Sequence, residues 1–176
     1  MAFPARARLV MEAAWTAVHV TLDLSTAQEV EFVDLTPRLE DLAWEHGLEC
    51  GVVTVQTRHT TTGVLINELE PLLLEDFRRT FERAAPRLAG YAHDDFRRRR
   101  VNLVPNERVN GHAHCQALLL RASESVNVAD GALCLGRWQR VLFVELDGPQ
   151  PREVSVTLLG QRGQRGQVVK RHFLCT

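Results

Sequence analysis

Apolar and polar residues alternate along several short stretches of the chain, a pattern typical of strands with one buried face. The clearest stretch is 14–24, in which Val18, Val20 and Leu22 share one face. Asp130-Gly131 has the composition of a hairpin turn. The pattern predicts a chain rich in short strands, with further members at 30–35, 50–57, 63–67, 125–128, 132–135, 139–147 and 152–160.

Two segments carry apolar residues at the 3–4-residue spacing of a helix. The first is predicted to begin at Thr36 as the N-cap, with Pro37 in the first helical position, and to close at His46-Gly47. The second is predicted to begin at Pro71 and to end before Pro86.

Between the second helix and the later strands lie a polar segment, 87–111, and an apolar run within 111–122. The polar segment is rich in Arg, Asp, Asn and Gly and is expected to be a long loop, which in compact domains is often functional or disordered. The apolar run is dominated by Ala and Leu rather than β-branched residues, so a short helix is expected. Helices grouped between sets of strands favour an α+β fold with a largely antiparallel sheet system.

Length and charge place this chain among ordinary globular domains. It has 176 residues, 45% of them hydrophobic, with 21 Lys and Arg against 22 Asp and Glu. This balance excludes a disordered chain and a globally basic nucleic-acid coat. We expect a single domain over 1–160 followed by a flexible basic tail over 161–176, which contains a GQR repeat.

No apolar stretch reaches the length of a signal peptide or a membrane span, so a cytoplasmic protein without a membrane or nucleic-acid partner is expected. Standard dinucleotide and P-loop motifs are not found in the sequence. The four cysteines form no C-x-x-C pair, which favours small buried or incidental thiols over a zinc or redox site: Cys50, Cys115, Cys134 and Cys175.

The seven histidines divide into two groups. Three have simple interpretations as exposed or helix-terminal residues: His19, His46 and His172. The other four lie at a predicted strand end or at the long loop and its boundary: His59, His93, His112 and His114. Neutral imidazoles from separate segments can form a zinc-type or acid–base cluster, but the spacing is also compatible with plain loop composition.

Other polar residues could contribute to a site, each with a structural alternative. The run Arg97–Arg100 could bind phosphate or form a solvated loop. Asn67 could line a site or cap the second helix, and Trp138 could be a packing anchor. Glu145 lies in an otherwise apolar strand, and if buried it needs a partner such as Arg or a metal-bound His.

In collinear order these segments resemble the YjbQ-like family, described as secondary thiamine-phosphate synthases. The resemblance covers about residues 10–160. The matching pieces are His59-Thr60-Thr61 with Gly63, Ile66-Asn67-Glu68 before Pro71, Tyr91-Ala92-His93-Asp94, Asn110 to His114 with Ala117, Asp130-Gly131, and Leu135-Gly136-Arg137-Trp138-Gln139 leading to Phe143-Val144-Glu145-Leu146-Asp147-Gly148-Pro149.

The resemblance implies an antiparallel β-sandwich flanked by two or three helices and assembled as a homotrimer. It also implies a pocket in which His59, His93 and His114 form the metal or acid–base cluster and Glu145 orients one imidazole. The residues implied to contact substrate are Thr61, Asn67, Trp138 and Gln139.

The implied reaction joins hydroxymethylpyrimidine diphosphate to thiazole phosphate and releases diphosphate, whose departure requires stabilisation by cations. Mg²⁺ is the usual partner of diphosphate but prefers oxygen ligands, whereas three imidazoles suit a zinc-like divalent metal. Two alternatives therefore stay open: a metal-dependent hydrolase or lyase of unknown substrate, and a non-catalytic trimeric protein that binds a small molecule.

Overall fold

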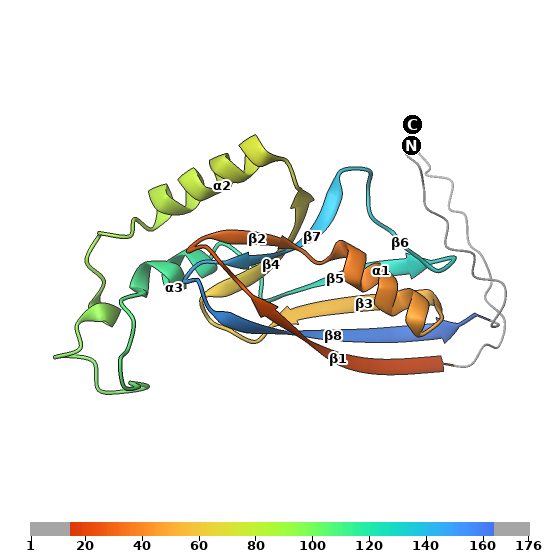
Figure 1. The fold of residues 1–176 in the computed structure, drawn as a ribbon, viewed down its shortest axis with the longest axis horizontal. Coiled ribbons are helices and arrows are strands. Elements are labelled where there is room, and N and C mark those ends of the chain that lie inside the picture. Colours follow the sequence, from red (N-terminus) through yellow and green to blue (C-terminus); the bar gives the residue numbers. More distant parts are fainter. Residues whose placement is uncertain (1–14, 164–176) are drawn as a thin grey trace, which may run out of the picture.

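The alternating stretches of the sequence form two antiparallel sheets in the structure, a computed structural model that describes residues 15–163 (Figure 1). The larger sheet has the strand order β1-β8-β3-β5-β6, with bounds Trp15–Ser25, Pro151–Arg162, Leu48–Thr57, Ser123–Ala129 and Ala132–Leu133. The smaller sheet has the order β2-β7-β4, with bounds Glu31–Asp34, Gln139–Glu145 and Thr62–Glu68.

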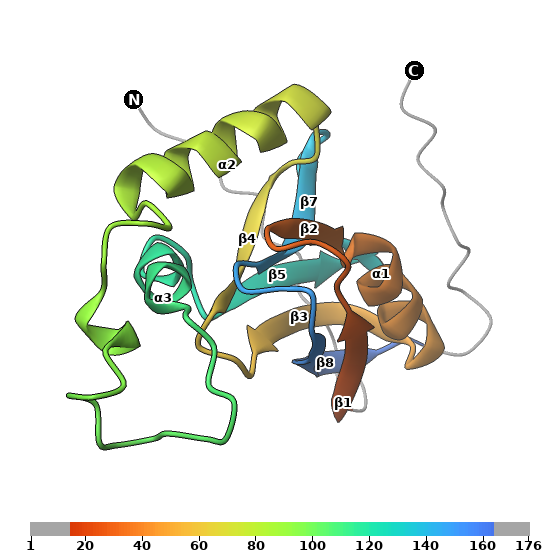
Figure 2. The same cartoon turned by 60° about the vertical axis from the view of Figure 1, so that its left-hand side comes forward.

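Three α-helices and one 3₁₀ turn complete the described part of the chain, with bounds Thr36–Glu45 (α1), Pro71–Ala84 (α2), Gly111–Ala117 (α3) and Ala92–Asp94 (η1). Helix α1 packs beside the larger sheet, while α2 and α3 lie on the far side of the smaller sheet (Figure 2). The mixed α+β fold with antiparallel sheets is therefore confirmed.

Strand β7 lies at the centre of this arrangement because both of its faces are covered. Val141 and Phe143 belong to the core between the two sheets and α1, whereas Val144 belongs to a second core with Phe81 of α2. Side chains alternate along a strand, so Glu145 shares the face of Phe143 and points toward the larger sheet. A carboxylate at the end of a doubly covered strand must find a partner inside the protein.

The predicted start of α1 is wrong in one detail. Leu35 occupies the N-cap position, and no side chain caps the helix there. The hydroxyl oxygen of Thr36 instead accepts a hydrogen bond from the backbone N–H of Val141, at 2.9 Å, so it ties the helix to β7. The end of the helix agrees with the prediction, since Gly47 has a φ of 64°, which glycine adopts without strain.

Several predicted boundaries shift by a few residues. The third helix ends at Ala117, and β7 ends at Glu145. Strand β8 extends to Arg162, so the first two residues of the predicted tail belong to the larger sheet. Residues 164–176, with the rest of the tail, lie outside the described residues. Within 15–163, no helix is long and apolar enough to span a membrane.

Candidate functional site

His93 and His114 lie against each other although 20 residues separate them in the chain. Their ring centroids are 4.6 Å apart and their ring planes are inclined by 59°. His93 belongs to η1 and His114 to α3, and these two elements pack side by side. The structure therefore brings together two of the histidines predicted for the site.

Asp94 fixes this contact by capping α3 from another segment of the chain. Its Oδ1 accepts the backbone N–H groups of Asn110 at 3.1 Å and of Gly111 at 2.9 Å. Gly111 allows the close approach, because a Cβ there would lie 2.4 Å from Cβ of Tyr91. The segment that contains His93 is thus docked on the helix that contains His114.

Arg99 occupies the other side of His93. Its Nη1 lies 3.0 Å from Nε2 of His93 and 3.3 Å from Glu107, and its Nη2 donates to the backbone oxygen of Asn102 at 2.7 Å. A guanidinium can only donate, so Nε2 of His93 is the acceptor and carries no hydrogen. Arg99 therefore organises the long loop, while its neighbours Arg98 and Arg100 are exposed.

An open depression of about 520 Å³ lies beside this segment, and it is lined by Ala92, His93, Arg98, Arg99, Val101 and Asn102. Burial lowers the pKa of His114 below its ordinary value, and the adjacent His93 acts in the same direction, whereas the Asp147 carboxylate opposes the shift. His114 is thus favoured in its neutral form, which can accept a proton or donate a lone pair.

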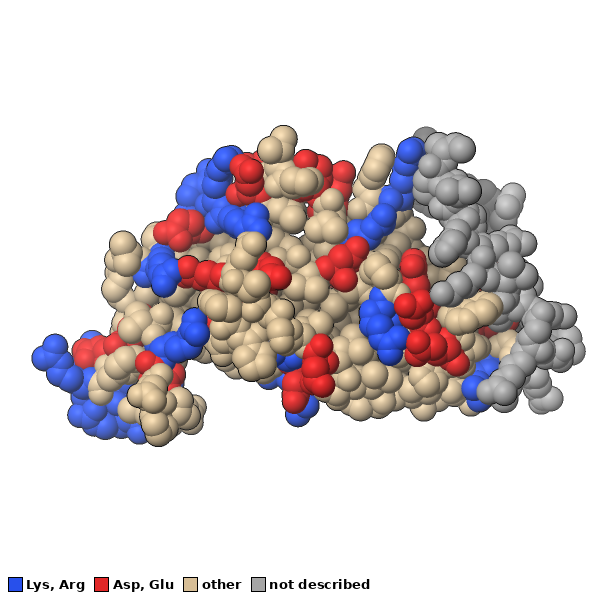
Figure 3. All heavy atoms as spheres, in the orientation of Figure 1, with Lys and Arg blue, Asp and Glu red and all other residues tan. Residues whose placement is uncertain are grey.

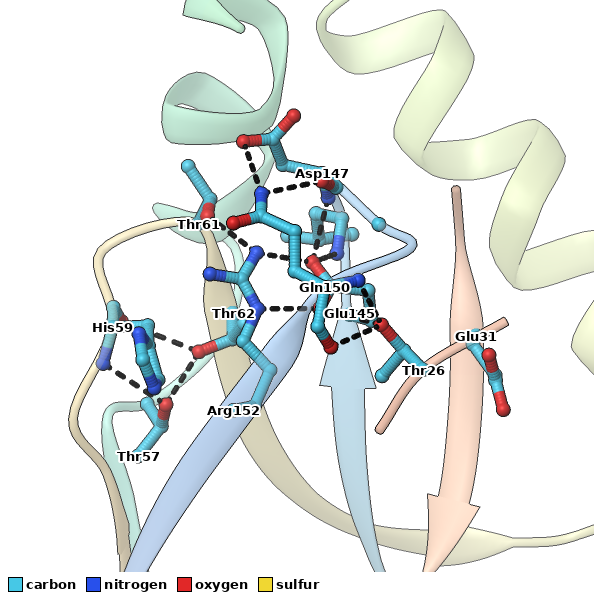
Figure 4. A network of polar contacts seen from close by, with 12 residues as sticks. Thr26, Glu31, Thr57, His59, Thr61, Thr62, Glu145, Asp147, Gln150 and Arg152 are labelled. Atoms are coloured by element: carbon cyan, nitrogen blue, oxygen red, sulfur yellow. Dashed lines mark hydrogen bonds and ion pairs between the residues drawn. The ribbon is translucent and has the colours of Figure 1, made fainter. Parts of the chain in front are cut away.

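Glu145 and Arg152 form a buried ion pair at the meeting point of β7 and β8 (Figure 4). Nε of Arg152 lies 2.6 Å from Oε2 of the carboxylate and Nη2 lies 2.7 Å from Oε1. Glu145 is fully buried and also accepts the backbone N–H groups of Leu146 and Asp147. Of the two partners considered for Glu145, arginine is the one observed, and its implied role of orienting an imidazole stays a prediction.

His59 lies near this ion pair, in the turn between β3 and β4. The backbone N–H of Glu153 donates to Nε2 of His59 at 2.8 Å. The pKa of His59 is lowered, first by burial and then by the positive charge of Arg152. Thr61, one residue before β4, accepts a hydrogen bond from Arg152 Nη2 at 3.2 Å. His59 and Thr61 therefore belong to the group around the ion pair.

Asp147 connects the ion pair to α3. Its backbone N–H binds Glu145, and its carboxylate accepts hydrogen bonds from Asn110 Nδ2 at 2.8 Å, Arg108 Nε at 3.0 Å and Gln150 Nε2 at 3.1 Å. Asn110 immediately precedes α3 and is also bonded to Asp94. A continuous set of hydrogen bonds thus runs from Arg152 to the segment that contains His114.

The remaining predicted substrate-binding residues lie elsewhere. In the β4–β7 pair, Thr62 is opposite Glu145, whereas Glu68 is opposite Gln139 at the other end. Six residues of extended strand span about 20 Å. The residues at that far end are Asn67, Trp138 and Gln139. Asn67 is exposed, and the Gln139 side chain accepts the N–H of Gly136, so their substrate-binding role stays a prediction.

His112 lies two residues before His114 in α3 and is buried. Neither of its ring nitrogens has a hydrogen-bond partner among the described residues. The carboxylate of Glu29 lies 3.4 Å from Nε2. The Tyr91 ring lies beside it, with the centroids 6.5 Å apart. His112 thus faces the β1–β2 turn rather than the His93–His114 pair.

A metal held by His59, His93 and His114 stays a prediction. Among residues 15–163, no three His, Cys, Asp or Glu side chains form a group that could hold a metal ion. Nε2 of His59 and Nε2 of His93 each already accept an N–H hydrogen bond. Metal binding at these atoms would require both hydrogen bonds to be given up, so the donor set as it stands does not fit a three-histidine site.

Sequence reasoning missed the residues that organise both groups, above all Asp94, Asp147 and Arg152. The strand pattern contains a signal for Arg152. Every second residue of β8 points inward, and these inward positions are 152, 154, 156 and 158. An arginine on the apolar face of a strand predicts a buried acidic partner, and Glu145 was the acidic residue in an apolar strand.

Comparison with known proteins gives one consistent family. The family profile described as "UPF0047 protein YjbQ-like" matches residues 20–161. A UPF0047 protein of Archaeoglobus fulgidus is 42% identical over 138 residues, which cover 78% of this chain and 98% of the relative. A UPF0047 protein of Methanothermobacter thermautotrophicus is 35% identical over 140 residues, which cover 80% of this chain and 90% of the relative.

Solved structures agree with the sequence comparison. The crystal structure of a YbjQ-like protein of unknown function from Sulfolobus solfataricus has a TM-score of 0.75 at 28% identity and covers 84% of this chain and all of its own. A hypothetical protein from Aeropyrum pernix has a TM-score of 0.71 at 31% identity, with 82% and 99% of the two chains covered. These proteins share the fold, and their descriptions assign no activity.

Proposed function

Since the chain belongs to the YjbQ-like UPF0047 family, we propose that it is an enzyme of the thiamine-phosphate synthase type with His93 and His114 at its catalytic centre. The observation that supports the proposal is the contact between these two imidazoles, with centroids 4.6 Å apart. Two chain segments and the Asp94 cap are arranged to hold the rings in this position.

The proposed reaction breaks the bond between the pyrimidine methylene carbon and diphosphate and forms a bond from that carbon to the thiazole nitrogen. The leaving diphosphate gains negative charge, which N–H donors and cations stabilise. The imidazole N–H groups of the pair and the neighbouring arginines are groups of this kind. The neutral state favoured for His114 keeps one imidazole N–H that can donate a hydrogen bond to the leaving diphosphate.

The test uses the purified full chain with hydroxymethylpyrimidine diphosphate and thiazole phosphate, and thiamine phosphate is quantified by mass spectrometry. We expect turnover by the wild type and a loss of at least 100-fold, in the range of general acid–base catalysis, in His93→Gln and in His114→Gln. His19→Gln is the matched control, because this histidine is exposed on the outer side of β1, where its side chain forms a hydrogen bond with Thr157. Equal turnover in all four proteins would remove the proposal.

A second candidate function, a metal-dependent hydrolase or lyase of unknown substrate, is supported by the same favoured neutral state of His114, but it requires His59 and His93 to give up the hydrogen bonds on their Nε2 atoms. A neutral imidazole is the form that binds zinc-like metals. Elemental analysis of purified protein separates the two candidates. Stoichiometric zinc, nickel or iron combined with only trace synthase turnover would favour the second, and metal-free protein with full turnover would favour the first.

We also propose that the protein works as a homotrimer in the cytoplasm, as the family resemblance implies. Exposed apolar side chains on the long loop and the end of α3 support an assembly, because exposed apolar surface often marks interfaces. Figure 3 shows the loop projecting from the body with tan side chains among blue arginines. The apolar residues are Phe96, Val101, Leu103, Val104, Val109, Leu118 and Leu119.

Sedimentation velocity measures this assembly directly, and a 20 kDa species at all concentrations would contradict it. If the protein assembles but binds no metal and turns over neither substrate, a non-catalytic trimeric ligand-binding role becomes the better account. In that case a small molecule that binds the folded state would raise the thermal stability with the logarithm of its concentration once that exceeds the Kd.

A further inference from the structure

The guanidinium of Arg152 has an edge that the protein does not use. Glu145 takes Nε and Nη2, and Thr61 takes a second contact from Nη2. Nη1 makes no hydrogen bond to any residue within 15–163, and it is not among the fully buried polar atoms without a partner, so it keeps some contact with solvent. Figure 4 shows this free nitrogen on the side of His59.

Two side chains bonded to the start of β8, those of His59 and Thr61, carry donors of their own. His59 accepts the backbone N–H of Glu153 at Nε2, so its neutral ring carries its hydrogen on Nδ1, which can only donate. The Thr61 oxygen accepts from Arg152, which leaves the hydroxyl hydrogen available for an acceptor. Only 6% of the Arg152 side chain is exposed, so packing as well as Glu145 fixes its position.

We propose that Arg152, Thr61 and His59 form a binding site for a phosphoryl group. The three side chains present donors from the start of β8 and from the turn before β4, and an oxyanion is the group that accepts from all of them. The inference rests on the proposed function only in taking the phosphoryl group to be part of a phosphorylated substrate; the binding itself stands on the geometry.

The charge arrangement is suited to a reversible anion site. Glu145 compensates the charge of Arg152, so the guanidinium is kept inside the protein without a ligand at tolerable cost. The remaining N–H groups stay oriented by the bidentate contact, which lowers the cost of ordering them when a ligand arrives. The exposed Arg97, Arg98 and Arg100 lack such support, because none has a carboxylate partner among the described ion pairs.

The test is isothermal titration of the full chain with inorganic phosphate and with diphosphate. We expect saturable binding by the wild type and about tenfold weaker binding by Thr61→Val, the effect of losing one hydrogen bond to a charged group. Arg152→Lys keeps the charge beside Glu145 but loses the planar fork, and it should weaken binding by more than tenfold. Arg58→Gln is the control, since Arg58 is an exposed neighbour paired with Glu153, and its affinity should match the wild type.

Outcomes for this site and for the proposed function are separable. Equal affinity in the wild type, Thr61→Val and Arg152→Lys would overturn the phosphoryl site, as would the absence of binding at millimolar phosphate. If Arg152→Lys does not fold, Thr61→Val and His59→Phe decide the result. Phosphate binding that weakens in Thr61→Val, together with turnover that His93→Gln and His114→Gln leave unchanged, would remove the synthase proposal without affecting the phosphoryl site.

Discussion

The negative charge of Glu145 determines which groups surround this buried side chain. It lies fully buried at the end of β7, with Arg152 on both of its oxygens and two backbone N–H groups on one of them. A buried ion pair of this kind adds little stability over an apolar pair, but the loss of one member leaves the other charged and unpaired. The pair is therefore more important for holding the site in one arrangement than for net stability.

Glu145→Gln is expected to lower the free energy of unfolding by about 3–5 kcal/mol, because Arg152 stays buried without a counter-ion. Urea denaturation measures the change. Glu153→Gln, which removes an exposed partner of Arg58, is the control and should cost about 0–1 kcal/mol. A similar small loss in both variants would show that Arg152 does not depend on Glu145.

The two histidines with shifted pKa predict the pH dependence of stability. The pKa of His59 and of His114 lies below 6.5 in the folded protein, chiefly through burial. The unfolded chain therefore binds protons first as the pH falls through about 6.5, and the free energy of unfolding decreases below that pH. Above that pH the two histidines are neutral in both the folded and the unfolded protein, and their contribution to the free energy of unfolding is fully present.

Urea denaturation at about pH 8 and about pH 5.5 checks this sign for the wild type and for His114→Gln. The wild type should lose stability toward the acid side, and the variant should lose less because one of the two histidines has been removed. A variant with the same pH dependence as the wild type would mean that His114 does not contribute through its protonation.

At the scale of elements, α3 depends on other segments for its position. The helix is only seven residues long and has no side-chain cap from its own N-cap residue, Asn110. Helices this short are marginal on their own, so contacts from elsewhere must hold it. Asp94 supplies the missing cap, and Asp147 binds the side chain of Asn110.

Asp94→Ala is expected to cost about 0.5–2 kcal/mol, the usual effect of removing a cap, and to separate η1 from α3. Cross-peaks between the His93 and His114 rings in NMR spectra should weaken together with stability. Asp95→Ala is the matched variant, because the Asp95 side chain accepts a hydrogen bond from the nearby backbone N–H of Arg97 and its loss should leave the ring contact intact. Unchanged cross-peaks in Asp94→Ala would contradict the capping role.

Gly111→Ala tests the same junction from the other side. The added Cβ would lie 2.4 Å from Cβ of Tyr91, so the loop must shift, and we expect a loss of about 1–3 kcal/mol. Gly136→Ala is the control, because the nearest atom to its Cβ is the flexible end of Gln139 at 3.3 Å. If thermal melting shows equal effects in both variants, tight packing of Tyr91 on α3 is not required.

Over the whole molecule, the strands and helices could be predicted because each has a local pattern. Alternation identified β1, β3 and β8, and Pro71 with Pro86 bounded α2. The start of α1 was misjudged because Thr36 bonds to β7, more than 100 residues away, and no local pattern reports such a contact. The role of a polar side chain therefore depends on hydrogen-bond partners that are distant in the sequence.

The same limit explains what was and was not predictable of the site. His93 and His114 were identified from motifs, and their contact depends on a long loop that happens to close on α3 through Asp94. Asn67 and Trp138 were grouped with them because sequence motifs carry no distance, yet they lie at the opposite end of β4 and β7 from Thr62 and Glu145. The register of the β4–β7 pair places residues of the same motif at opposite ends of the two strands.

The central claim is that His93 and His114 together contact one bound molecule. A crystal structure of the full chain grown with thiamine phosphate, with diffraction recorded at a zinc absorption edge, tests it most directly. The account predicts ligand density against both rings, whose centroids stay close to the 4.6 Å found here. Separated rings, with the ligand or any metal bound on an unrelated surface, would contradict it.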